Sequence, residues 1–276
     1  AIEDPVRKAI LRNGANAKGT LPSPIAAWDF RTGPNDLVGT MHAKAIGTAK
    51  LTPNGASIDG KTGFLRTAPI GTNIRAKTLE AWVTLDNRTQ RGGGVISLET
   101  PDGGEFDAVV FGENEPGRWM AGSNGFVRTK PFGGEAETVD GPTHFAISYA
   151  ADGTITGYRN GRPYGKGYQS NGPREFKAGM AVAAFGIRHE PAGGNRMLAG
   201  TVHAARVYDR ALTADDVAAS FAGGPQFIGD AEIDAKLSPE SRKAASELRK
   251  KRIALTAELG AARGRANEVT YANVAK

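Results

Sequence analysis

The sequence predicts an all-β fold: a sandwich of two antiparallel sheets with a short N-terminal and a longer C-terminal helical appendage. Glycine (37) and proline (15) are frequent, and only 39% of the residues are hydrophobic, which favours short strands joined by tight turns. Runs of β-branched and aromatic residues recur between glycine-rich turns, as in sandwich proteins. At 276 residues, the chain is long enough to bury a sizeable core.

Three parts are expected along the chain. Residues 1–24 form a helix and a linker, because Asp4 can accept the free N–H groups of a first helical turn and Pro5 fits its first position. The sandwich occupies residues 25–224. Residues 225–276 form a linker and a basic helix.

Period-two alternation and one hairpin signal place the strands. In the run THFAISY, Phe145, Ile147 and Tyr149 are expected to face one side of a sheet. Asn160-Gly161 predicts a two-residue hairpin, because both positions of a type I′ turn need positive φ. The expected strands are in residues 63–68, 78–85, 94–100, 106–112, 143–149, 155–165 and 200–208.

Two helices are expected after the last strand. Thr213 with Asp216 three residues later resembles a capping box, which predicts a helix over residues 214–221. Ser238 is the expected cap of a second helix with a narrow apolar stripe. That helix is expected to pack on the sandwich or on a partner.

Charge and composition exclude several classes of function. The net charge is +6, and residues 236–265 hold nine basic against three acidic residues, which accounts for the whole excess. A neutral body with a basic tail that lacks aromatics predicts no nucleic-acid binding. Without cysteine there is no thiolate chemistry, and no apolar run reaches the ~20 residues of a membrane span.

Three phrases carry a resemblance to a known family. TLEAWV, HFAISYAADGTITGYRNGRPYG and LAGTVHAARVYDRALTADDVAASF resemble strands and a closing helix of laminin-G-like jelly-roll domains, in the concanavalin A-like lectin/glucanase superfamily. The resemblance covers roughly Ile25 to Phe221, and VYDRALTA is its most specific part. It implies a concanavalin A-like jelly-roll sandwich.

A second resemblance concerns the setting of the domain. FGIRHEPAGGNRML and the tail from Ser238 to Ala275 resemble inserts of planctomycetal cytochrome-c-type multidomain proteins. This implies that the chain is a piece of an exported protein, located in the periplasm, at the cell surface or outside the cell. The terminal helices would then belong to neighbouring domains.

One strand resembles an incomplete catalytic motif. Some glucanases of this fold carry Glu-x-Asp-x-x-Glu, and the matching run here is Glu105 to Val110. A retaining glycosidase needs two opposed carboxylates about 5 Å apart, and Val110 stands where the second acid would be. We expect no catalysis, with Glu105 and Asp107 as solvated edge or turn residues.

A calcium ion is a further expectation from the resemblance, because related sandwiches often hold one between their first and last strands. Asp29 and Asp209 are the expected ligands, since calcium prefers carboxylate oxygens. The alternative makes Asp29 a turn former and Asp209 a partner of Arg210 or a helix-start residue. Two carboxylates fall short of the six to eight oxygens that calcium takes.

Sugar binding asks for an exposed aromatic ring beside planar hydrogen-bonding groups. Trp28 and Trp82 are assigned to the core, because they lie in the strand phrases of the resemblance. Trp119 could serve as the platform or could pack a strand onto the sandwich. The candidate ligand-binding residues are Arg118, Trp119, Asn124, Tyr158, Arg188, His189, Glu190 and Asn195.

The leading hypothesis is a non-catalytic carbohydrate-binding or adhesion module with a polysaccharide or glycan as ligand. The first alternative is a structural module that docks neighbouring domains through the basic helix. The second is a glycoside hydrolase or lyase, because one fold hosts many functions.

Overall fold

The computed structural model describes residues 21–139, 141–225 and 230–251, together with residues 2, 5, 6 and 255. The chain divides into two compact units, Ala17–Gln226 and a smaller one made of Ala1–Asn16 and Phe227–Lys276. The helix expected to start at Pro5 lies almost entirely outside the described residues, so it stays a prediction.

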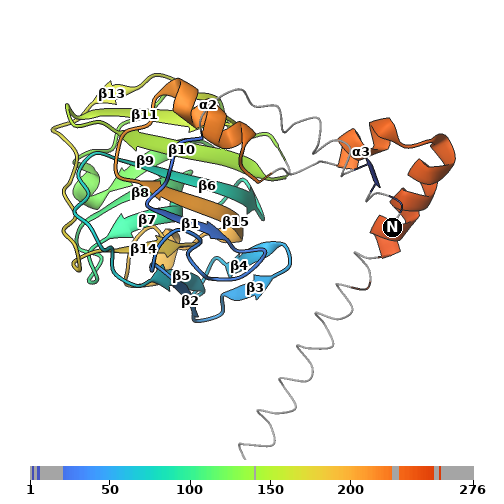
Figure 1. Cartoon of the computed structure of the whole chain (residues 1–276), viewed down its shortest axis with the longest axis horizontal. Helices are drawn as coiled ribbons and strands as arrows, with labels where there is room; N and C mark the ends of the chain where they lie inside the picture. Colours follow the sequence, from blue (N-terminus) through green and yellow to red (C-terminus); the bar gives the residue numbers. More distant parts are fainter. Residues whose placement is uncertain are drawn as a thin grey trace, which may run out of the picture. The chain divides into compact units, whose positions relative to one another are not determined.

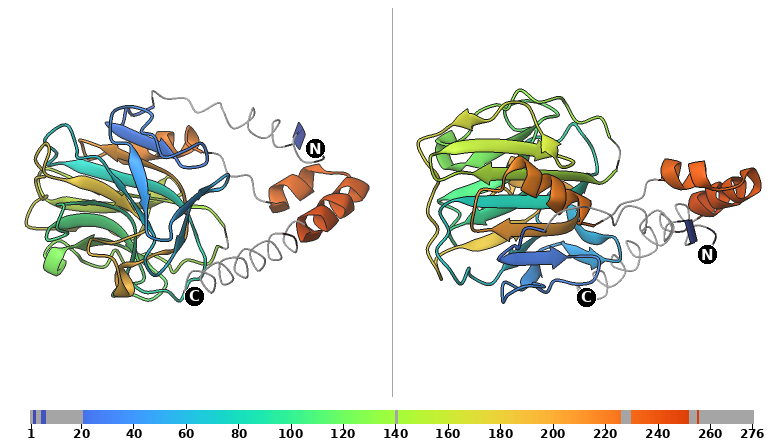
Figure 2. Two further views of the ribbon diagram at one scale, coloured as in Figure 1. Left: turned by 90° about the horizontal axis from the view of Figure 1, so that it is seen from below. Right: turned by 45° about the horizontal axis from the view of Figure 1, so that its top comes forward.

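The larger unit is a jelly-roll sandwich of two antiparallel sheets, which confirms the predicted fold class (Figure 1; Figure 2). The nine-stranded sheet has the order β12-β11-β10-β6-β15-β4-β3, with β1 on β15 and β13 on β11. Its strands are β1 (Ala26–Asp29), β3 (Lys50–Thr52), β4 (Gly55–Asp59), β6 (Lys77–Leu85), β10 (Thr143–Tyr149), β11 (Thr154–Arg159), β12 (Arg162–Pro163), β13 (Tyr168–Gln169) and β15 (Ala199–Tyr208).

The six-stranded sheet has the order β2-β5-β14-β7-β8-β9. Its strands are β2 (Ala43–Ile46), β5 (Phe64–Thr67), β14 (Val182–Phe185), β7 (Gly93–Glu99), β8 (Phe106–Phe111) and β9 (Trp119–Ser123). Two 3₁₀ turns, η1 (Asn124–Phe126) and η2 (Gly194–Arg196), follow β9 and β14 along the chain.

The main core lies between the two sheets and follows the predicted alternation. Phe145, Ile147 and Tyr149 of β10 belong to it, while Ala146 packs on the opposite face of the sheet. Trp28 contacts Phe185 with 4.9 Å between ring centroids. Trp28 and Trp82 are both buried, as expected.

The hairpin and the helix that the sequence predicts are both present. Asn160 and Gly161 join β11 to β12 with φ of +51° and +75°, the positive values of a type I′ turn. Helix α2 (Ala214–Ala222) begins with the complete capping box of Thr213 and Asp216. It is one residue longer than predicted and lies over the nine-stranded sheet (Figure 1).

A closed polar cluster fixes α2 to that sheet. The carboxylate of Glu80 (β6) accepts hydrogen bonds from His144 Nε2 at 2.7 Å, Tyr208 OH at 2.9 Å and Ser220 Oγ at 2.8 Å. Gly161 N–H donates to His144 Nδ1, which leaves the ring proton on Nε2. Burial would raise the pKa of Glu80, but the hydrogen bonds from His144 and Ser220 and the charge of the neighbouring Arg206 lower it.

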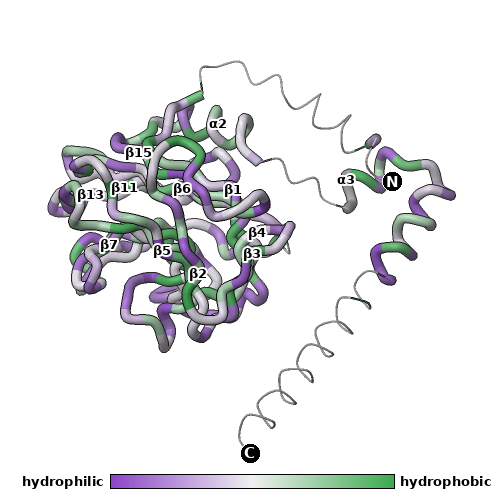
Figure 3. Tube along the Cα trace, turned by 60° about the horizontal axis from the view of Figure 1, so that its bottom comes forward, coloured by the Kyte–Doolittle hydropathy of each residue, from purple (hydrophilic) through white to green (hydrophobic). Residues whose placement is uncertain are grey.

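The smaller unit contains α3 (Asp230–Lys236), in a segment that was expected to be a linker. Residues 239–251 are helical, and Ser241 N–H donates to Ser238 Oγ at 3.2 Å, which confirms the predicted cap. Hydrophobic and hydrophilic stretches alternate along these helices (Figure 3). Leu248 is 56% exposed, and none of the described helices is long and apolar enough to cross a membrane.

Candidate functional site

A pocket of about 870 Å³ opens at one end of the sandwich. Glu99, the last residue of β7, pairs with both Phe106 of β8 and Val182 of β14, so these strand ends meet there. The β7–β8 turn and the segment leading to β14 line the pocket. The lining residues are Thr100, Pro101, Asp102, Gly104, Glu105, Arg174, Glu175, Phe176, Lys177 and Met180.

A fully buried ionic cluster lies behind this pocket. Lys77 Nζ is 2.9 Å from Asp107 Oδ2, and neither side chain is exposed. Arg128 Nε donates to Asp107 Oδ1 at 2.8 Å. Because Lys77 begins β6 and Asp107 lies in β8, the pair joins the two sheets. Burial lowers the pKa of Lys77, and the Asp107 carboxylate opposes that shift.

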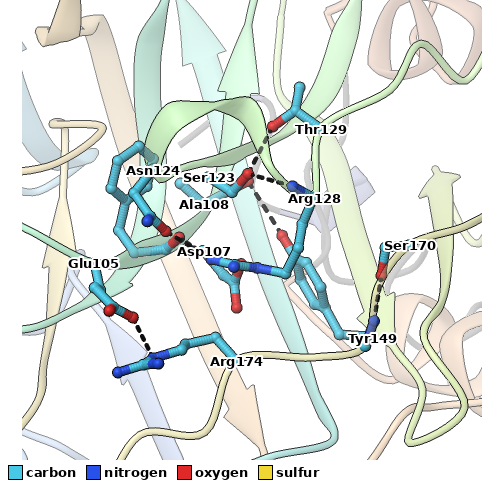
Figure 4. Close-up of polar contacts among 12 residues, drawn as sticks. Glu105, Asp107, Ala108, Ser123, Asn124, Arg128, Thr129, Tyr149, Ser170 and Arg174 are labelled. Carbon is cyan, nitrogen blue, oxygen red and sulfur yellow. Dashed lines mark hydrogen bonds and ion pairs between the residues drawn. The ribbon is translucent and has the colours of Figure 1, made fainter.

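The cluster holds the pocket wall through the backbone. Lys77 Nζ donates to the carbonyl oxygen of Arg174 at 2.8 Å and lies 5.1 Å from the ring centroid of Phe176. The guanidinium of Arg174 in turn pairs with Glu105 across the pocket (Figure 4). A buried charge pair therefore positions an exposed ion pair.

The remaining wall groups are polar at one side and apolar at the other. Thr100 Oγ1 and Gly104 N–H donate to Asp102 at 2.6 and 3.0 Å, and these hydrogen bonds hold the pKa of the exposed Asp102 carboxyl below its usual value. Met180 is 61% exposed and supplies a large apolar surface.

Trp119 and Tyr158 are both buried, so neither can serve as a sugar platform, and the alternative expected for Trp119, packing a strand onto the sandwich, is confirmed. Trp119 faces inward from β9, its indole stacks on Phe145 at 4.9 Å, and its Nε1 donates to Glu137. It is core rather than platform. Tyr158 faces α2 and packs with Val217 in a separate apolar cluster.

Two other predicted residues, Asn124 and Arg118, do not line the pocket. Asn124 follows β9, and its Oδ1 accepts a hydrogen bond from Arg128 Nη2 at 2.9 Å, next to the buried cluster (Figure 4). Arg118 precedes β9 and pairs with Glu115 at 3.0 Å. Of these two residues, only Asn124 comes near the pocket.

The predicted residues Arg188, His189, Glu190 and Asn195 lie on one loop, and contacts within the protein occupy their side chains. Arg188 pairs with Glu113, and its Nη2 donates to Asn195 Oδ1 at 3.3 Å. His189 stacks on Phe106 with 4.4 Å between ring centroids. Glu190 accepts from Arg66 at 3.1 Å. These contacts pack the 188–195 loop onto the six-stranded sheet.

One buried carboxyl, that of Glu99, lies under this loop. Glu99 Oε2 accepts a hydrogen bond from Glu190 N–H at 2.9 Å, and its Oε1 has no hydrogen-bond partner among the described residues. Burial raises the pKa of Glu99 to about 8. At neutral pH the group is therefore mostly protonated.

The two expected calcium ligands, Asp29 and Asp209, do not lie together. Asp29 lies opposite Ala204 in the β1–β15 ladder, and Asp209 comes five residues after Ala204, roughly 17 Å along the strand. Asp29 instead accepts from Arg31 Nε at 2.8 Å and Nη2 at 2.7 Å. Across the described residues, no three His, Cys, Asp or Glu side chains are grouped as a metal site requires.

The glucanase-like run divides between the two faces of β8. Val110 packs with Phe106 and Met120 on the outer face. Asp107 is fully buried between the sheets, so the expectation of a solvated residue is wrong for it. Glu105 lies at the pocket edge, 35% exposed. The expectation failed because Asp107 is paired with Lys77 and Arg128. These cations are distant in the sequence and come next to Asp107 only when the chain folds.

The family profile of the concanavalin A-like lectin/glucanases superfamily, in its laminin-G-like form, matches residues 59–218. The chain belongs to this family. The resemblance drawn from the strand phrases is thereby confirmed. Among curated proteins, no sequence matches the chain.

Several solved structures share this concanavalin A-like fold. Domain 4 of AbnA, an extracellular GH43 arabinanase from Geobacillus stearothermophilus solved with arabinotriose, is 19% identical, with a TM-score of 0.58, 74% of this chain covered and 100% of that one. Trypanosoma rangeli sialidase with the inhibitor DANA is 15% identical (TM-score 0.54; 79% and 37%). The botulinum neurotoxin serotype D binding domain is 10% identical (TM-score 0.51; 73% and 52%).

The sequence pointed to this end of the domain only through Glu105. The sequence places Lys77 at the start of an apolar strand, but no pattern in residues 77–85 predicts that Asp107 is its partner. Arg174 and Met180 lie in a segment without regular structure and carry no motif. Chemically, the pocket offers planar hydrogen-bonding groups and three apolar side chains, Pro101, Phe176 and Met180.

Proposed function

We propose that the chain binds glycans without cleaving them, through the pocket between the β7–β8 turn and residues 174–180. The observation that carries this is the exposed Glu105–Arg174 pair, positioned by the buried Lys77. Planar carboxylate and guanidinium groups suit sugar hydroxyls, and preorganised groups bind at lower entropic cost. The arabinanase domain solved with arabinotriose has the same fold and supports the proposal by analogy.

The ionisation of the pocket favours binding over catalysis. A glycosidase needs a protonated general acid beside a second carboxylate. Hydrogen bonds lower the pKa of Asp102, and Glu105 is paired with Arg174. The Asp102 carboxyl is therefore not set up to donate a proton at neutral pH.

Titration of a panel of neutral and acidic polysaccharides against the 276-residue chain tests the proposal. We expect Arg174→Ala to weaken binding about tenfold or more, as for the loss of one charge-assisted hydrogen bond. Arg118→Ala is the matched control, because Arg118 is similarly exposed, 42% against 45%, and also pairs with a glutamate. Equal losses in both variants, or no glycan bound by the wild type, contradict the proposal.

The proposal includes the export of the parent protein, because polysaccharides lie mostly outside the cell and the arabinanase is extracellular. Secretion of a reporter fused behind the parent gene's leader tests this. Retention of that reporter inside the cell contradicts it.

Docking of neighbouring domains is a second candidate function, favoured by one observation. Leu248 and Leu255, in the smaller unit, are 56% and 54% exposed. Apolar side chains on a helix gain stability when a partner covers them. Co-purification of the chain with the adjoining domains of its parent protein, with and without Leu248→Lys, tests this function separately from glycan binding.

A further inference from the structure

The turn after β9 exposes an aromatic side chain on a strained backbone. Phe126 is 49% exposed and has φ of +57°. Bulky residues rarely occupy this region, because Cβ approaches the carbonyl oxygen that follows. Strain of this kind persists where surrounding contacts hold it, and it is often found at binding sites.

Side chains on both sides of the turn hold it in place. Ser123 Oγ accepts a hydrogen bond from Arg128 N–H at 2.9 Å and lies 3.0 Å from Thr129 Oγ1. Thr129 N–H donates to the carbonyl oxygen of Phe126 at 3.1 Å. Arg128 is itself fixed by the buried Asp107. The ring of Phe126 is therefore presented by a rigid turn.

The turn borders the proposed glycan pocket. The Arg128 guanidinium donates to Asn124 Oδ1 at 2.9 Å and to the carbonyl oxygen of Phe106 at 3.0 Å. Phe106 directly follows Glu105, which lines the pocket. Figure 4 shows Asn124, Arg128 and Asp107 beside the Glu105–Arg174 pair.

We propose that Phe126 is an aromatic platform for a sugar residue next to the pocket, so that the ligand is an oligosaccharide spanning both. This inference rests on the proposed glycan binding. An exposed ring packs its face on the C–H side of a sugar ring. The platform that Trp119 cannot provide is thus supplied by a residue seven positions later in the chain.

The charges around the pocket indicate a neutral sugar chain. Asp102, Glu105 and Glu175 are acidic, while Arg174 and Lys177 are basic. Arg174 is paired with Glu105, and the exposed Asp102 is held in its charged form by hydrogen bonds. Acidic sugars would meet this carboxylate, and like charges repel.

Oligosaccharide ladders of arabinan, xylan, mannan and cellulose, with polygalacturonate as the acidic comparison, test the inference by calorimetry. We expect Phe126→Ala to weaken trisaccharide and longer chains about tenfold, the worth of one aromatic contact, and to leave disaccharides unchanged. Phe126→Tyr should keep wild-type affinity. Val127→Ala is the matched control, because Val127 is 55% exposed in the same turn.

Phe126→Gly separates the platform from folding. Glycine adopts positive φ without strain, so we expect Tm to rise by about 2–4 °C while the longer chains bind as weakly as to Phe126→Ala. Equal losses in Val127→Ala, or preference for polygalacturonate, would overturn the inference. If Arg174→Ala loses binding while Phe126→Ala binds every chain length like the wild type, the inference alone fails. If the wild type binds no probe, the proposed function fails with it.

Discussion

Two strand carboxylates, Glu80 and Asp107, are both completely buried, yet their surroundings differ. Glu80 accepts hydrogen bonds from a histidine and two hydroxyl groups beneath α2, with Arg206 at 3.8 Å. Asp107 instead meets two cations, Lys77 and Arg128, between the sheets. The first cluster ties a helix to one sheet. The second joins both sheets and supports the pocket wall.

The difference shows that a buried charge can attach a helix to a sheet in one place and support a pocket wall in another. Burying an ion pair costs desolvation energy that the attraction only partly offsets, so such pairs are weak evidence for stability alone. The Glu80 cluster is closed and satisfies each carboxylate oxygen. In the Asp107 cluster, Asp107 holds Lys77, and Lys77 in turn holds the backbone of Arg174 through a hydrogen bond. The guanidinium of Arg174 lies in the pocket, where it can contact a ligand.

The largest expected effect is on Asp107. Asp107→Asn removes the anion from two buried cations, and breaking a buried pair in this way costs about 3–5 kcal/mol. Denaturant unfolding measures the loss. Asp209→Asn, at an exposed residue, should stay within about 0.5 kcal/mol of the wild type. A loss below about 1 kcal/mol for Asp107→Asn would show that water compensates the cations.

A smaller loss is expected at Glu80. Glu80→Gln keeps the shape but removes the charged acceptor of three hydrogen bonds, which costs about 2 kcal/mol. Because its folded pKa is lowered, the contribution of Glu80 is present above the unfolded pKa and is lost as pH falls through the folded value. The unfolding free energy of Glu80→Gln should therefore decline less than that of the wild type between pH 5 and 3. Parallel declines would contradict the assignment.

A third buried carboxyl, Glu99, sharpens the comparison because its pKa is raised, whereas that of Glu80 is lowered. Its folded pKa is about 8, so between the unfolded pKa and pH 8 the folded state holds one proton more. The unfolding free energy attributable to Glu99 should fall by about 1.4 kcal/mol for each pH unit of increase in that window. Glu99→Gln should lack this slope and be the more stable protein above pH 8. Unfolding from pH 5 to 9, with Glu175→Gln as the exposed control, measures it; equal slopes would refute it.

Most of the fold follows from local patterns. The alternation in β10, the positive φ values at Asn160 and Gly161 and the Thr213 cap each depend on a few neighbouring residues, and all three were predicted. The site residues fared worse. Trp119 and Tyr158 were chosen by residue type, but the side of the strand on which each lies decided that both are buried.

The sequence by itself determined the sandwich, the family and the neutral charge of the body, because strand period, turn chemistry and composition act over short distances. Only the tertiary structure decided which charges meet. Lys77, Asp107, Arg128 and Arg174 are separated by as many as 97 positions along the chain, and no local pattern couples them. Their contacts depend on the stacking of two sheets, which also leaves Phe126, and not Trp119, exposed beside the pocket.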